Sequence, residues 1–116
     1  MKAKYIAETA AVLVAGDRDR VHGTKVKNHE NIAEMWNGFL RVRRDPAAPL
    51  SAEDVALMMC CLKIARTQHG TFNADDYIDL AGYAACAGEI ASVAETEDRP
   101  VMVTGDAITG LKLKEM

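Results

Sequence analysis

The sequence lacks any long hydrophobic run, and this absence bounds its location. No apolar segment approaches the roughly 20 residues that a membrane-spanning helix needs, and the opening MKAKYIAE has a glutamate where a signal peptide would continue its apolar stretch. We therefore expect a soluble, cytoplasmic protein without a membrane partner.

A strong charge of one sign is also missing. The chain has 14 basic and 17 acidic side chains, a net charge of −3, so it offers no overall field that would attract a polyanion. This balance argues against non-specific nucleic-acid binding.

Cysteine is scarce, and several signatures of catalysis are absent. Cys60 and Cys61 are adjacent and Cys86 stands alone, which fits neither a disulfide framework nor a zinc site with C-x-x-C spacing. We expect three reduced core cysteines. The sequence has no Gly-rich phosphate loop, no G-x-S-x-G elbow and no H-E-x-x-H pair. It therefore carries none of the usual marks of kinases, serine hydrolases or zinc proteases.

What the chain does contain is helical periodicity. With 116 residues and 49% apolar side chains it can form one domain with a core. The spacing of apolar residues predicts helices over 3–15, 29–41, 51–69 and 74–94. The expected fold is all-α, a compact bundle of about four helices over residues 1–95. The tail, 96–116, loses this period and is either a short hairpin, an arm that grips a second subunit, or disordered.

The third of these helices has the clearest start and the most apolar interior. Ser51 and Asp54 have the spacing of a capping box, and VALMMCCL over 55–62 is apolar on every face. We expect this helix to lie at the centre of the bundle. Three other short helices can hardly cover it, so we also expect a homo-oligomer.

Two cations lie near the end of that helix. Lys63 and Arg66 are spaced i, i+3 and project from the same face. Their long stems can simply reach solvent from the end of the helix, where cations also suit the helix dipole. The alternative is a binding site for a phosphate anion.

The fourth helix carries acids on one stripe. Asp75 or Asp76, then Asp79, then Tyr83 follow i+3 and i+4 steps. Oxygen ligands on one stripe suit magnesium (Mg²⁺), which often bridges to substrate phosphates. Helix capping can explain Asp54 and Asp76. Asp79 lies beyond the first turn and is the preferred functional acid.

The segment between the first two helices is polar and highly charged. It includes Asp17, Arg18, His22 and Asn28, which could close over such a site from the side, because loops commonly carry binding groups.

Four strings in this order resemble an uncharacterised phage and prophage family of small helical proteins: GDRDRVHG, NHENIAEMW, DVALMMCCLKIAR and DDYIDLAGYAA. The resemblance covers about residues 5–90. It implies a phage origin, hence the cytoplasm of the host cell, and an all-helical fold. It implies no activity.

The acid-bearing helices are more distantly similar to the MazG-like all-α nucleoside triphosphate pyrophosphohydrolases, which hold magnesium with an E-x-x-E and an E-x-x-D helix. Asp76 and Asp79 form a D-x-x-D version of the second element. Asp54 stands where the first element would begin, with Met58 in place of a later acid. The similarity implies Asp54, Asp76 and Asp79 as metal ligands.

These observations lead to one hypothesis and two alternatives. The leading hypothesis is a protein that recognises a nucleotide phosphate through Lys63, Arg66 and Arg18, with Asp17, Asn28 and Tyr83 nearby. In its catalytic form the protein is a magnesium-dependent pyrophosphohydrolase. The first alternative is a non-catalytic protein that sequesters a nucleotide. The second is an adaptor that binds another protein and has no pocket.

Overall fold

Four helices make up most of the chain that the structure describes. The computed structural model describes residues 1–15, 24–93 and 101–103. The helices are α1 (Ala3–Ala15), α3 (Lys25–Val42), α4 (Ala52–Thr67) and α5 (Ala74–Val93). Within these ranges there is no strand, so the predicted all-α fold is confirmed. None of the described helices is both long and apolar enough to cross a bilayer.

Some of the predicted features lie outside the described residues. These are the charged segment with Asp17, Arg18 and His22 and most of the tail, of which only residues 101–103 are described, without regular structure.

The start of α3 differs from the prediction. The helix begins at Lys25 rather than at residue 29, because Thr24 caps it: the Thr24 side chain accepts a hydrogen bond from the backbone N–H of Lys27 at 3.3 Å. The polar KVKN stretch resembles a loop by composition, yet it forms the first turn. Asn28 is therefore a helical residue and not part of the preceding loop.

The starts of α4 and α5 agree with the sequence. Ser51 and Asp54 form the expected capping box at the N-terminus of α4. The Asn73 side chain accepts a hydrogen bond from the backbone N–H of Asp75 at 3.0 Å and so caps α5. Gly70, in the short connection between these helices, has a φ of 77°, a conformation that favours glycine.

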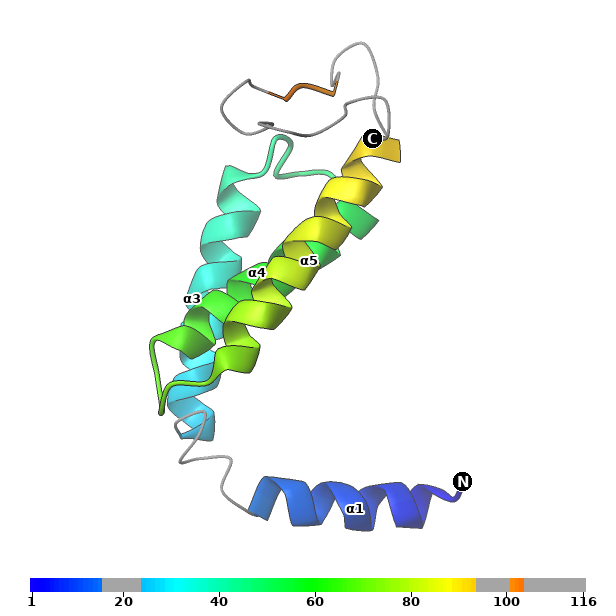
Figure 1. Ribbon diagram of the computed structural model, residues 1–116, viewed down its shortest axis with the longest axis vertical. Helices are drawn as coiled ribbons and strands as arrows, with labels where there is room; N and C mark the ends of the chain where they lie inside the picture. Colours follow the sequence, from blue (N-terminus) through cyan, green and yellow to red (C-terminus); the bar gives the residue numbers. More distant parts are fainter. Residues whose placement is uncertain (16–23, 94–100, 104–116) are drawn as a thin grey trace.

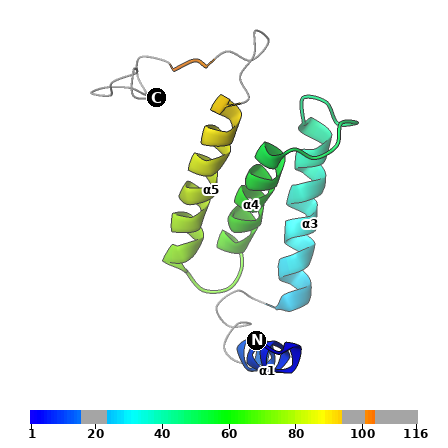
Figure 2. The same cartoon turned by 90° about the vertical axis from the view of Figure 1, so that its right-hand side faces the viewer.

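Helices α3, α4 and α5 lie side by side in one antiparallel layer, with α4 in the middle (Figure 2). The indole N–H of Trp36 donates to the carbonyl oxygen of Met58 at 2.7 Å and ties α3 to α4. On the other side, the Cys60 thiol lies 3.9 Å from the carbonyl oxygen of Leu80 in α5. The central position of α4 is as expected from its apolar sequence.

The layer has a thin core. Its buried apolar residues are Ile32, Ala56, Cys60, Ala65 and Ala87, mostly small, because a single layer covers α4 on two sides only. Large side chains stay open to solvent.

Two regions show this exposure directly. Every residue of α1 is exposed, and the helix lies beyond the end of the layer (Figure 1). All three cysteines are free, but Cys86 is exposed; the prediction that all three belong to the core is wrong for this residue, because it lies on a side of α5 that no other helix covers.

Candidate functional site

An ion pair joins the last turns of α4 to the start of α5. The ammonium nitrogen of Lys63 lies 3.0 Å from Oδ2 of Asp79. The two partners differ in exposure: the side chain of Lys63 is 12% exposed and that of Asp79 is 46% exposed. The pair therefore sits at the edge of the layer, with its cation covered and its carboxylate open to solvent.

The ion pair fixes which residues of α4 and α5 lie at the same height. Arg66 follows Lys63 by three residues, and Asp76 precedes Asp79 by three residues. Since the helices are antiparallel, Arg66 and Asp76 occupy the same level, nearer the end of the layer. Asp76 is only 3% exposed, and no hydrogen bond or ion pair to its carboxylate forms among the residues that the structure describes.

The same argument places Asn28 of α3 at this level. Trp36 follows Asn28 by eight residues, and Met58 precedes Arg66 by eight residues. The hydrogen bond between Trp36 and Met58 therefore puts Asn28 level with Arg66 on antiparallel helices. Figures 1 and 2 both show that α3 begins at the end of the layer where α4 passes into α5.

Two buried polar atoms at this level have no partner. Within the described ranges, neither Oδ1 of Asn28 nor Nε of Arg66 has a hydrogen-bond partner, and Asn28 is only 5% exposed. A buried donor or acceptor without a partner costs about 1–3 kcal/mol. Such atoms are therefore expected where a ligand or another chain supplies the missing groups.

We call these residues the layer-end cluster: Asn28, Lys63, Arg66, Asp76 and Asp79. Three adjacent helices contribute to it, with two cations, two carboxylates and one amide. Tyr83, one turn beyond Asp79, is half-buried on the same stripe of α5. Of the residues expected in a site, the structure thus gathers these at one end of the layer.

Asp54 lies elsewhere. It belongs to the first turn of α4, at the opposite end of that helix from Arg66. Its Oδ2 accepts hydrogen bonds from the backbone N–H of Ser51 at 2.9 Å and from the guanidinium of Arg43 at 2.8 Å. Within one chain the structure does not bring Asp54 to Asp76 and Asp79, because the length of α4 separates them.

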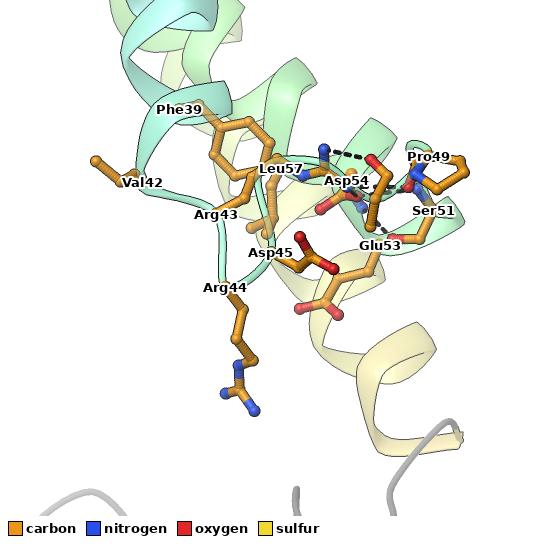
Figure 3. Close-up of a pocket in the computed structure, with 11 residues that line it drawn as sticks. Phe39, Val42, Arg43, Arg44, Asp45, Pro49, Ser51, Glu53, Asp54 and Leu57 are labelled. Atoms are coloured by element: carbon orange, nitrogen blue, oxygen red, sulfur yellow. Dashed lines mark hydrogen bonds and ion pairs between the residues drawn. The ribbon is translucent and has the colours of Figure 1, made fainter.

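The surroundings of Asp54 form a corner between α3 and α4 (Figure 3). The guanidinium of Arg43 also donates to the carbonyl oxygens of Ala48 and Pro49, each at 2.9 Å, and so ties the turn to both helices. An open pocket of about 390 Å³ lies beside this corner. Arg44 points away from the ion pair.

The corner also perturbs the Asp54 carboxyl. The hydrogen bond from the backbone of Ser51, helped by the charge of Arg43, holds the pKa of Asp54 below its ordinary value of 3.8. Every group around Asp54 thus stabilises a local turn. Local patterns did not identify Arg43, because it reaches its carboxylate from eleven residues earlier in the chain.

The metal-binding capacity of the layer-end cluster rests on two carboxylates. No group of three or more histidine, cysteine, aspartate or glutamate side chains able to hold a metal occurs in the described part of the chain. Asp76 and Asp79 supply hard oxygen donors on one stripe. Magnesium is commonly held by one or two carboxylates together with substrate phosphates, so these donors fit that ion only if a phosphate completes its ligands.

Comparison with known proteins identifies the family of the chain. A fold does not by itself determine a function, so the antiparallel helical layer defines a class and no activity. Residues 5–91 match the model of a domain of unknown function (DUF6378). The chain belongs to this family.

Relatives of the chain occur in mycobacteriophages. It is 38% identical over 79 residues to the Gene 55 protein of Mycobacterium phage L5, covering 68% of this chain and 47% of that protein. It is 34% identical over 85 residues to the Gene 55 protein of Mycobacterium phage D29, covering 73% of this chain and 52% of that protein. The chain thus spans about half the length of these relatives. No solved structure gives a significant match. The predicted resemblance to an uncharacterised phage family is confirmed.

Proposed function

We propose that the layer-end cluster binds the phosphate group of a nucleotide. The observation that carries this proposal is the buried Nε of Arg66, which has no hydrogen-bond partner in the described part of the chain and lies one turn from Lys63. Guanidinium and ammonium groups are the usual partners of phosphate oxygens. A phosphate at this position would supply the acceptor that Arg66 lacks.

A ligand larger than inorganic phosphate is supported by Asn28. Its Oδ1 is an acceptor that needs a donor, and a fully ionised phosphate offers none. The hydroxyl groups of a sugar or the amino group of a base would provide one. An amide that can accept as well as donate, level with the guanidinium of Arg66, therefore fits a ligand that carries hydroxyl or amino groups as well as phosphate, such as a nucleotide.

Magnesium is the cofactor that fits the acids of the cluster. Asp76 and Asp79 would hold it, while its other ligands would be water and phosphate oxygens. When bound, magnesium would neutralise phosphate charge and polarise the phosphoryl group. The contribution of the chain is to orient the phosphate with Arg66 and Lys63 and to keep both carboxylates on one side of it.

Whether the bound nucleotide is cleaved is a separate question. The pyrophosphohydrolase hypothesis needs more carboxylates than Asp76 and Asp79, since two-metal chemistry generally uses a larger set, and a second subunit would have to supply Asp54 or another acid. The sequestration hypothesis needs no more than the residues of the cluster. The single chain favours binding, with catalysis tested by pyrophosphate release from nucleoside triphosphates.

The test is a thermal-shift screen of nucleotides with and without magnesium, because a compound that binds only the folded state raises the melting temperature. Lys63→Ala and Arg66→Ala should each remove a charge-assisted contact of about 1.5–3 kcal/mol, which lowers affinity roughly 10- to 150-fold. Lys27→Ala is the matched control, an exposed cation in the first turn of α3. If no nucleotide shifts the melting curve, the site is wrong and the adaptor hypothesis replaces it.

Self-association is the second part of the proposal. Val55 of α4 and Ile78 of α5 are 54% and 65% exposed, and from residue 80 to 93 only Glu89 carries a charge. An uncovered helix in water normally has a charged face. Such a helix therefore needs a covering surface, and a second copy of the chain is the partner that is always present.

The glycines of α5 support a close helix contact from outside the chain. A Cβ atom added at Gly82 or Gly88 would meet no atom within 4 Å, so packing within the chain does not require them. Glycine inside a helix costs about 1 kcal/mol relative to alanine. Its presence is explained if the backbone of another helix approaches α5 there.

Gly82→Leu tests this contact. In a monomer, the substitution should stabilise the exposed helix by about 0.8 kcal/mol, because leucine is a better helix former than glycine. In an oligomer with a helix packed at Gly82, it should weaken association instead. Sedimentation of the wild type and the variant at micromolar concentration distinguishes these outcomes; a monomeric wild type would contradict the proposal.

A further inference from the structure

The ion pair between Lys63 and Asp79 bears on how the proposed phosphate site works. Lys63 has two possible partners: Asp79, which it contacts at 3.0 Å, and the proposed phosphate beside Arg66. An ammonium group has three donors but one position. Contact with a phosphate would therefore draw Lys63 away from Asp79 or share it between two anions.

The exposure of the pair indicates that it can open. The Asp79 side chain is 46% exposed, so water can solvate the carboxylate as Lys63 leaves. The Lys63 side chain is only 12% exposed, so the pair is not a fully exposed one, but opening it leaves the carboxylate in contact with water, unlike the opening of a fully buried pair. The carboxylate released in this way keeps a neighbour of the same charge, Asp76, three residues away on the same face of α5.

We infer that the Lys63–Asp79 pair is a latch that opposes phosphate binding until a cation occupies Asp79. In the metal-free protein, Asp79 competes with the phosphate for Lys63. A divalent cation held by Asp79 and Asp76 removes this competition, so cation and phosphate each raise the affinity for the other, as linkage requires. The inference rests on the proposed function and adds to it a coupling between cation binding at Asp79 and phosphate binding at Lys63.

The experiment measures the affinity of the full chain for inorganic pyrophosphate by calorimetry in the presence of a chelator. Asp79→Asn should bind pyrophosphate about fivefold more tightly than the wild type, the lower end of common coupling factors, because Lys63 is free. Asp75→Asn is the matched control: it removes the same charge from an exposed position one turn earlier and should change the affinity much less. Circular dichroism checks that each variant is folded.

A double-mutant cycle separates the latch from simple charge removal. In a Lys63→Met background, Asp79→Asn should raise the affinity for pyrophosphate no more than Asp75→Asn does, since there is no ammonium group to release. A gain of equal size with and without Lys63 would overturn the inference, because it would show repulsion of the anion by Asp79 alone. Added magnesium should raise the affinity of the wild type more than that of Asp79→Asn.

The outcomes also distinguish a failure of the latch from a failure of the proposed function on which it rests. If pyrophosphate and nucleotides bind neither to the wild type nor to any variant, the proposed function fails and the latch with it. If the wild type binds but the cycle shows no coupling between Lys63 and Asp79, the phosphate site stands and the latch is wrong.

Discussion

Asp54→Ala tests whether Asp54 is a structural residue or a metal ligand. The side chains of Arg43 and Asp54 are 8% and 15% exposed, so removing the carboxylate leaves a largely buried guanidinium with only the carbonyl oxygens of Ala48 and Pro49. Removing one partner of a buried ion pair costs about 3–5 kcal/mol. Because this pair keeps some contact with water, we expect the lower end, about 3 kcal/mol.

A loss of this size is large for a small domain. At about 4–8 °C per kcal/mol it lowers the melting temperature by roughly 12–24 °C. The assay is urea unfolding followed by circular dichroism, together with nucleotide affinity measured at a temperature where the variant is folded. Asp75→Ala is the matched control, because Asp75 is also an acid in the first turn of a helix but is exposed; it should cost about 0.3–1 kcal/mol.

The two hypotheses predict opposite pairs of results. If Asp54 is structural, the Asp54→Ala variant is less stable than the wild type but binds nucleotide and magnesium with the same affinity. An Asp54 that binds metal through a second subunit gives a loss of magnesium-dependent affinity. Wild-type stability combined with lost affinity would refute the structural argument.

Two further predictions follow from the same geometry. The folded-state pKa of Asp54 is held below 3.8, so the contribution of this carboxylate to the free energy of unfolding is complete above pH 3.8 and is lost as the pH falls through the folded-state pKa. The stability difference between wild type and Asp54→Ala, measured by urea titration, should therefore shrink below pH 3.8. A difference that stays constant with pH would contradict this prediction. Cys86 is exposed, whereas burial raises the pKa of the Cys60 and Cys61 thiols. A maleimide should therefore label Cys86 first. A Cys86→Ser variant that is labelled as fast as the wild type would refute this prediction.

Helix starts could be predicted where a capping residue stands next to a clear apolar period. Ser51 with Asp54 and Asn73 with the acids after it both gave correct starts for α4 and α5. The start of α3 was missed, although Thr24 provides a cap, because the polar residues after it mask the apolar period. A cap followed by a polar first turn differs little in sequence from a loop.

The membership of the candidate site could be predicted in part. Spacing along one helix predicted a shared face for Lys63 and Arg66 and another for Asp76 and Asp79, because i, i+3 neighbours lie on the same side of a helix. The burial of Asn28 and its place beside α4 were not predictable, since its burial is set by packing against another helix. The same limit applies to Asp54: spacing shows which face of α4 it lies on, but its partner Arg43 lies just after the end of α3.

The position of α3 along α4 decides whether the layer-end cluster exists. The indole N–H of Trp36 donates to the carbonyl oxygen of Met58 at 2.7 Å, and this bond places Asn28 level with Arg66. A slip of α3 by one helical turn would move Asn28 by about 5.4 Å along the layer, more than the length of a hydrogen bond. The single polar atom of Trp36 thus fixes which charged and amide side chains can meet one ligand at the end of the layer.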